Sequence, residues 1–210
     1  MDVTRQRARS DTAKAARRTA IIEAAMARLD TRDLLAVSMQ DIANACGLTK
    51  PALYNYFQAR EELFLAVYRR LLRDWLTDFN RSLLAAGHPL PRATFNSLFV
   101  TSFAARPLLC HLTNHLTATL APRLTASSCE SLKAETSDQL AGLRALLVHY
   151  GYADADDAGD LAWAYYTILV GAAQIADWPA DMARMTDGGA QASDRTAFEA
   201  NCLATLALLK

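Results

Sequence analysis

The stretch SMQDIANACGLTKPALYNYF, residues 38–57, decides how the fold of this chain is interpreted. It predicts two short helices joined by a tight turn. Ser38 is an N-cap residue, and Asp41 three positions later completes a capping box at the start of the first helix. Gly47 marks the end of that helix, because glycine enters the left-handed conformation without the steric penalty of a Cβ atom. Thr49 then caps the second helix.

Apolar residues in this stretch predict that the two helices pack together. Ile42 and Ala43 give the first helix a small apolar face, and Leu53 and Phe57 share a face of the second because they lie four residues apart. This is the pattern of a helix-turn-helix, whose second helix enters the major groove of DNA. The alternative is a helical corner that binds nothing. Two caps, a turn glycine and an exposed aromatic pair agree better with a DNA-binding unit.

Composition and charge indicate an all-α protein with a basic amino-terminal part. Apolar residues make up 52% of the 210 residues, while Gly (8) and Pro (6) are few, which favours long helices over a turn-rich β-protein. Residues 1–60 hold ten basic and six acidic residues, a net charge of +4, and residues 61–210 carry −4. The overall charge of zero excludes a uniformly basic coat, but this division fits a DNA reader joined to a second domain.

No segment of the sequence predicts export or membrane insertion. The amino terminus is polar and rich in arginine, without the apolar region of a secretory signal. The longest apolar run, residues 161–176, is shorter than a membrane span and contains Thr167 and Gln174. The four cysteines are scattered singly, which fits reduced thiols in the cytosol. We therefore expect a cytoplasmic protein with no membrane partner.

The chain divides into three predicted parts. Residues 1–12 read as a flexible basic arm that follows phosphates or enters a minor groove when DNA is present. Residues 13–76 form the DNA-binding domain, and residues 77–210 form a helical body. The limit between the last two lies inside a long helix predicted over residues 60–86, which ends at Gly87.

The body is predicted to be helical throughout and to form a dimer. Its expected helices cover residues 92–105, 107–120, 126–150, 154–177 and 194–209. The helix over residues 154–177 is apolar nearly all round, so it must be buried on two sides. One side can face its own core and the other a second subunit, with the helix over residues 194–209 completing the interface. A two-fold dimer also suits the DNA-binding domain, because each of its two copies then contacts one half-site of the DNA. The alternative is the central core helix of a monomer.

The sequence resembles the TetR (tetracycline-repressor-type) family of transcriptional regulators. The resemblance lies in IIEAAMARL (residues 21–29), in the stretch 38–57, and in REELFLAVYRRLL (residues 60–72). It implies an amino-terminal three-helix DNA-binding domain and a carboxyl-terminal helical domain for ligand binding and dimerisation. It also implies a repressor that binds a palindromic double-stranded DNA operator as a homodimer and is released by a small-molecule effector.

The resemblance assigns DNA contacts residue by residue. Phosphates are implied for Thr49, Tyr54, Tyr56 and Arg60, base edges for Lys50, Pro51, Ala52 and Asn55, and an approach to the backbone for Ser38 and Gln40. The chemistry of the side chains agrees with this. A lysine donates to guanine O6 and N7, an asparagine pairs with adenine, and an alanine methyl contacts the thymine methyl. Hydroxyls and a basic group suit phosphates, which position a protein without specifying sequence.

An effector site in the body is expected to combine aromatic walls with a few polar groups. The candidate lining residues are Phe99, Phe103, Cys110, His111, Asn114, His115, Leu143, Trp163 and Tyr166. Ordinary core packing explains any single member of this set equally well. Neither the effector nor a cofactor can be named from the sequence.

Two other classes of protein stay open. One is an architectural DNA-binding protein of the same fold that has no effector. The other is a metal-dependent helical enzyme built on His111 and His115, which lie four residues apart on one helix face but lack a clear third ligand. We expect neither a metal site nor an enzyme, because the sequence carries no nucleophile elbow, no H-E-x-x-H motif and no phosphate-binding glycine loop.

Overall fold

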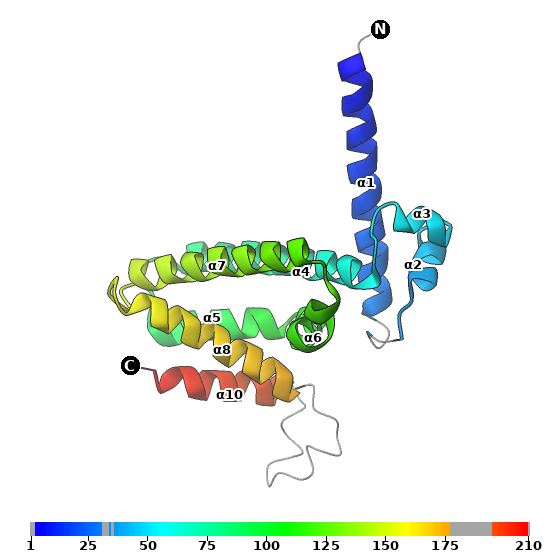
Figure 1. The fold of residues 1–210 in the computed structure, drawn as a ribbon. Helices are drawn as coiled ribbons and strands as arrows, with labels where there is room; N and C mark the ends of the chain where they lie inside the picture. The colour runs from blue at the N-terminus through cyan, green and yellow to red at the C-terminus, as the bar shows by residue number, and fades with distance from the viewer. Residues whose placement is uncertain (1–2, 31–33, 35, 177–194, 210) are drawn as a thin grey trace. The chain divides into compact units, whose positions relative to one another are not determined.

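The computed structural model describes residues 3–30, 34, 36–176 and 195–209, and every regular element in these ranges is a helix (Figure 1). The chain forms two compact units, Met1–Arg70 and Leu71–Lys210. The division falls inside α4, as does the predicted domain limit at residue 76. In the described part of the chain, no helix combines the length and apolarity needed to cross a membrane.

The helices of the first unit are α1 (Val3–Leu29), α2 (Met39–Ala45), α3 (Lys50–Tyr54) and the start of α4 (Arg60–Ala86). Their core is built from residues that the sequence pattern identifies. Ile21 and Ala25 of α1, Ile42 of α2, Leu53 of α3 and Phe64 of α4 have no exposed surface. Burying each of these larger side chains stabilises the unit by about 1.5–3 kcal/mol. The core therefore fixes α2 and α3 against α1 and the start of α4.

The first helix is longer than predicted, because α1 begins at Val3 rather than near residue 13. The segment predicted as a flexible arm, residues 1–12, is thus helical from Val3 onward. Between Val3 and Leu29 there is no Gly or Pro to stop a helix, and Arg, Gln and Ala all have high helix propensity. The absence of large apolar residues before Ile21 suggested disorder. It means that this segment cannot contribute to an apolar core, but it does not prevent the segment from forming a helix.

The second unit is built around a cluster of aromatic rings from three helices. It contains the rest of α4, α5 (Arg92–Ala104), α6 (Pro107–His115), α7 (Ala126–His149), α8 (Ala158–Ala176) and α10 (Arg195–Ala207). Trp75 of α4 lies 5.4 Å from Phe99 and 5.2 Å from Phe103 of α5, measured between ring centroids. Tyr165 of α8 lies 5.5 Å from Phe99. Edge-to-face pairs of this kind add about 0.5–1.5 kcal/mol each beyond their buried area.

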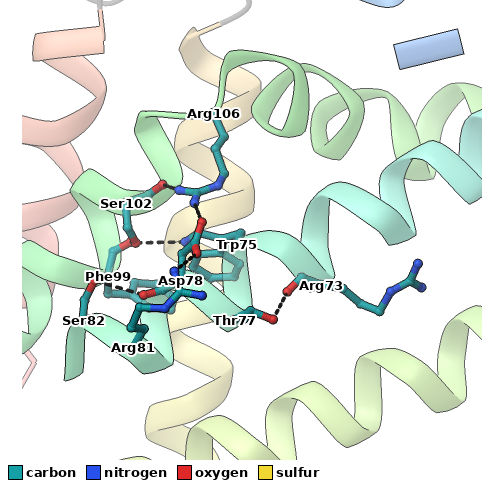
Figure 2. A network of polar contacts seen from close by, with 9 residues as sticks. All are labelled: Arg73, Trp75, Thr77, Asp78, Arg81, Ser82, Phe99, Ser102 and Arg106. Atoms are coloured by element: carbon teal, nitrogen blue, oxygen red, sulfur yellow. Dashed lines mark hydrogen bonds and ion pairs between the residues drawn. The ribbon is translucent and has the colours of Figure 1, made fainter. Parts of the chain in front are cut away.

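Polar contacts fasten α4 to α5 and to the start of α6 (Figure 2). The Trp75 indole Nε1 donates to Ser102 Oγ at 2.9 Å. The Arg106 guanidinium, just before α6, donates to the Ser102 carbonyl oxygen and forms an ion pair with Asp78 Oδ2 at 2.6 Å. Asp78 also pairs with Arg81, one turn further along α4. These contacts join three helices at a point where the chain turns.

The predicted helix over residues 107–120 is wrong in its second half. The α-helix α6 ends at His115, a π-helical turn covers Leu116–Leu120, and a 3₁₀ turn covers Ala121–Arg123. Pro122 has no N–H to donate and disfavours the α conformation at the residue before it, so a regular helix cannot continue there.

The helix α8 also differs from its prediction. It begins at Ala158 rather than Asp154, because the Asp154 carboxylate accepts hydrogen bonds from the backbone N–H groups of Asp156 and Asp157 and holds a turn. Residues 177 and 194, the expected ends of two helices, lie outside the described residues. Within this unit α8 buries one stripe, which includes Leu161 and Tyr165, while Trp163 on another side is 55% exposed.

Candidate DNA-binding site

The start of α2 is fixed by the predicted capping box. Ser38 has an extended conformation, and its Oγ accepts from the Asp41 N–H at 3.2 Å. Asp41 Oδ2 in turn accepts from the Ser38 N–H at 3.0 Å and from the Ser38 hydroxyl at 2.6 Å. A hydroxyl has only one proton to donate, and Ser38 donates it to Asp41. The predicted backbone contact of Ser38 would therefore compete with its own cap.

The turn between α2 and α3 depends on Gly47, which has φ of +63°. The Gly47 N–H donates to the Asn44 carbonyl at 3.3 Å, and the Leu48 N–H donates to the Ala43 carbonyl at 2.9 Å. This pair of bonds is the Schellman motif, which satisfies the last carbonyls of a helix. The turn thus sets the angle at which α3 leaves α2.

The helix α3 is short and is held from both ends. Thr49 Oγ1 accepts from the Ala52 N–H at 3.3 Å, and Leu53 is completely buried. Phe57, just after the helix, is 3% exposed and has the Arg18 guanidinium 4.5 Å from its ring centroid. Arg18 is a structural residue that sequence reasoning missed, because a cation–π contact to another helix leaves no local pattern.

Most predicted DNA-contacting residues lie on the exposed side of this pair of helices. The exposed members are Ser38, Gln40, Thr49, Lys50, Pro51, Tyr54 and Asn55, with Tyr54 at 41%, while Ala52 and Tyr56 are half-buried. The Gln40 amide donates to Asn44 Oδ1 at 2.8 Å, which orients it along α2. A cation, an amide and a phenol therefore stand on one short rigid helix, as readout of base edges and phosphates requires.

Arg60 differs from the other members of the predicted site. Its Nη1 donates to the Val37 carbonyl at 3.4 Å, and its Nη2 pairs with Glu61 at 3.2 Å. Its guanidinium carbon also lies 5.6 Å from the Phe64 ring centroid. Arg60 thus ties the start of α4 to the segment before α2. A phosphate contact would have to share a guanidinium that already has these partners.

The environment at the end of α2 changes the pKa of the Cys46 thiol. Cys46 forms the C-cap of α2 and is half-buried. Burial raises the pKa of the Cys46 thiol, and the positive charge of Arg17 on α1 opposes that change. The end of α2 and the middle of α1 are therefore electrostatic neighbours.

The predicted effector-site residues are divided among different parts of the second unit. Phe99 and Phe103 are buried in the aromatic cluster, and the Cys110 thiol lies 3.5 Å from the Phe103 carbonyl. Trp163 and Tyr166 form their own edge-to-face pair, with centroids 5.7 Å apart. Leu143 and Asn114 are half-buried on α7 and α6.

His111 and His115 lie close together, but two histidines are too few ligands for a metal site. The rings of His111 and His115 lie 4.7 Å apart, and His115 Nδ1 is 3.2 Å from Thr119 Oγ1. Among the described residues, no group of three or more His, Cys, Asp or Glu side chains could hold a metal ion. A structural zinc site normally needs four ligands.

A buried polar pair between α5 and α8 was missed by sequence reasoning. The Tyr165 hydroxyl donates to Asn96 Oδ1 in the core, and both residues are at most 5% exposed. Burial raises the pKa of Tyr165, while a hydrogen bond and the charge of nearby Arg92 oppose the change. Asn96 lies on a helix face that is otherwise aromatic, which could have indicated a buried polar partner.

Two family models together cover most of the chain. The model for bacterial regulatory proteins of the tetR family matches residues 21–67. The model for the tetracyclin repressor-like C-terminal domain matches residues 69–209, about two thirds of the chain. The short α2–α3 pair lies entirely within the first match.

Individual relatives match over shorter stretches. The HTH-type transcriptional repressor KstR2 of Rhodococcus jostii is 33% identical over 92 residues, which is 44% of each chain. The HTH-type transcriptional regulator BetI of Rhizobium meliloti is 33% identical over 89 residues, 42% of this chain and 43% of that protein. The match thus spans less than half the length of these relatives.

A solved structure extends the comparison of the fold to nearly the whole chain. A TetR-family transcriptional regulator from Mesorhizobium loti superposes with a TM-score of 0.54 at 19% identity, covering 93% of this chain and 97% of that one. At this identity the likeness concerns the fold alone. With both family models matching consecutive parts of the sequence, this chain belongs to the TetR family of regulatory proteins.

Proposed function

We propose that this protein is a sequence-specific transcriptional repressor that binds double-stranded DNA through α3. The observation that supports this most is the exposed side of α3, where Lys50, Tyr54 and Asn55 stand on a helix fixed by two caps and a Schellman turn. Such rigidity matters because base contacts are specific only when the donor and acceptor positions are set before binding. A repressor of this kind acts at the chromosome, so the cytoplasm is its expected location.

The proposal includes a homodimer built on α8 and α10. A groove of about 210 Å³ between these helices is lined by residues that include Gly171, Ala172 and Phe198. Trp163 on α8 and Leu208, which directly follows α10, are 55% and 80% exposed and add apolar surface. Small residues allow a second helix to approach closely, and a two-fold dimer offers two readers to one palindrome.

The dimer can be tested with one glycine and a matched control. A Cβ atom added at Gly171 meets nothing within 4 Å inside the subunit, and the same holds for Gly142 on α7. Gly171→Leu should therefore fold but separate the subunits, whereas Gly142→Leu should stay dimeric. Sedimentation equilibrium measures both, and a Gly171→Leu dimer as stable as the wild type would exclude this interface.

The proposal also includes release from DNA by a small molecule bound in the second unit. Release requires a ligand that prefers an arrangement in which the two readers no longer match half-sites about 34–36 Å apart. The half-buried Cys110, His111, Asn114 and His115 on α6 provide donors and acceptors beside an aromatic core, which supports a site for a small organic effector.

Selection of binding sites from random duplex DNA tests DNA recognition. The full chain should enrich a palindrome, and the enriched sequence should bind with at least about a thousandfold preference over random DNA. Failure to enrich any sequence, by a protein that is folded and dimeric, would refute the proposed function.

A further inference from the structure

The described side chains in the amino-terminal half of α1, those of residues 11–20, lie outside the apolar core of the first unit. Residues 11–20 are all exposed, whereas Ile21, Ile22, Ala25 and Leu29 are at most 8% exposed. Figure 1 shows this half of α1 continuing beyond α2 and α3 as an uninterrupted helix. It also lies outside the family match, which begins at residue 21.

This segment carries a strongly positive net charge. Residues 3–20 contain six basic residues and one acidic residue, a net charge of +5. After Val3, the only apolar residues before Ile21 are alanines. A helix without an apolar face gains little free energy from packing in the folded protein. Its excess of positive charge instead favours binding to a polyanion.

The register of α1 places two of the basic residues, Arg18 and Lys14, on the same side as the core. Counting back from Leu29 in helical steps of three and four residues leads through Ala25, Ile22 and Arg18 to Lys14. Arg18 marks the change, since its guanidinium stands over Phe57, which closely follows α3. The face that packs on the helix-turn-helix thus carries two basic residues, Arg18 and Lys14, in the turns that follow toward the amino terminus. Arg17, beside Cys46 of α2, borders it.

Geometry also fits a phosphate backbone. From Arg18 back to Val3 the helix extends about 22 Å, at about 1.5 Å per residue. One DNA strand carries a phosphate about every 3.4 Å along its axis, so this length spans about six phosphates. Arginine and lysine bind phosphate without reading sequence.

We propose that residues 3–18 of α1 form a second DNA-contacting element, which lies along the phosphate backbone of the duplex beside the segment that α3 reads. This inference rests on the proposed function, because it assumes that α3 is bound to DNA. Its contribution is affinity and salt dependence, independent of base sequence.

The test measures the salt dependence of binding to two unrelated 40-base-pair duplexes by fluorescence anisotropy. The variant is Lys14→Gln/Arg17→Gln, since both side chains are exposed and glutamine keeps a high helix propensity. The control is Arg73→Gln/Lys133→Gln, which removes two exposed charges from the second unit. Circular dichroism confirms that all three proteins are equally helical.

Each phosphate contact adds about 0.9 to the slope of log K against log salt. The variant should therefore lose about 1.8 in slope per chain on both duplexes, while the control keeps the wild-type slope. Raising the salt from 50 to 200 mM weakens DNA binding by some factor, and for the variant this factor should be about ten times smaller per chain than for the wild type. Asp11→Gln removes the single carboxylate of the segment and should tighten binding to both duplexes.

Two results would overturn the inference while the proposed function survives. One is a variant slope equal to that of the control. The other is a loss of affinity on only one of the two duplexes, which would make the segment a base reader. A wild-type protein that binds neither duplex better than serum albumin does would instead refute the proposed function itself.

Discussion

The turn at Gly47 offers a quantitative test of how the DNA-binding unit is held together. Gly47 has φ of +63°, and a Cβ atom added there would meet nothing within 4 Å. Gly47→Ala therefore causes no clash, and its whole cost is conformational. For an L-residue other than Gly, Asn or Asp this cost is about 1–2 kcal/mol. Gly47→Asn should cost less, because asparagine tolerates the left-handed region.

This cost should appear as easier local opening of α2 and α3. The Leu48 N–H donates to the Ala43 carbonyl, and the Leu53 N–H donates to the Thr49 carbonyl, so both amides report on the turn. A loss of 1–2 kcal/mol corresponds to about a 5- to 30-fold fall in hydrogen-exchange protection. Mass spectrometry or NMR of the full chain measures the exchange.

Gly142→Ala is the matched control. Gly142 lies inside α7 with open space around it, so alanine should raise helix stability there by about 1 kcal/mol at most. It should leave the protection of Leu48 and Leu53 unchanged. Wild-type protection in Gly47→Ala, or an equal loss in Gly47→Asn, would refute the argument from backbone conformation.

Three further predictions concern the second unit. Asn96→Ala removes the acceptor of the buried Tyr165 hydroxyl, so the free energy of unfolding in urea should fall by about 1–3 kcal/mol. Arg106→Gln breaks an ion pair whose Asp78 side chain is 45% exposed, so its loss in the same assay should stay within about 1 kcal/mol. Burial raises the pKa of Cys202 to about 12, so at pH 8 an alkylating reagent followed by mass spectrometry should label it far more slowly than in urea. Because the unfolded thiol loses its proton near the ordinary value of 9.0, this group also lowers the free energy of unfolding as pH rises from about 9 toward 12.

The helix-turn-helix could be predicted from sequence because its determinants are local. Ser38 and Asp41 cap one helix, Thr49 caps the next, and Gly47 occupies the one position with φ above zero between them. Each of these signals acts within four residues. Propensity, capping and turn chemistry all agree there, as they do where a sequence specifies its structure strongly.

The limits of other helices cannot be predicted from hydrophobic periodicity alone. The α-helix α6 ends at His115, where a π-helical turn leads to Pro122, and α8 begins at Ala158, after the Asp154 turn, although apolar residues continue past both limits. In α1, residues 3–12 are helical although hydrophobic periodicity assigned them to disorder, which agrees with their high helix propensity. Periodicity reports burial, so it fails where a helix is exposed.

The candidate effector site shows the same limit. Phe99 and Trp163 have equally suitable chemistry, but one is 5% and the other 55% exposed. Which side of a helix faces the core depends on the neighbours it packs against, and α8 packs against α7, α10 and α6. A list of suitable residues on several helices therefore cannot define one pocket.

The central claim is that α3 reads DNA, and site selection repeated with two variants tests it most directly. Lys50 and Tyr54 are both exposed on α3. Lys50→Ala should enrich the same palindrome with the preference relaxed at one base pair of each half-site, at a cost of about 1–3 kcal/mol. Tyr54→Phe should enrich the wild-type palindrome with lower affinity throughout. If Lys50→Ala enriches the wild-type sequence with undiminished preference at every position, α3 does not read the bases as described.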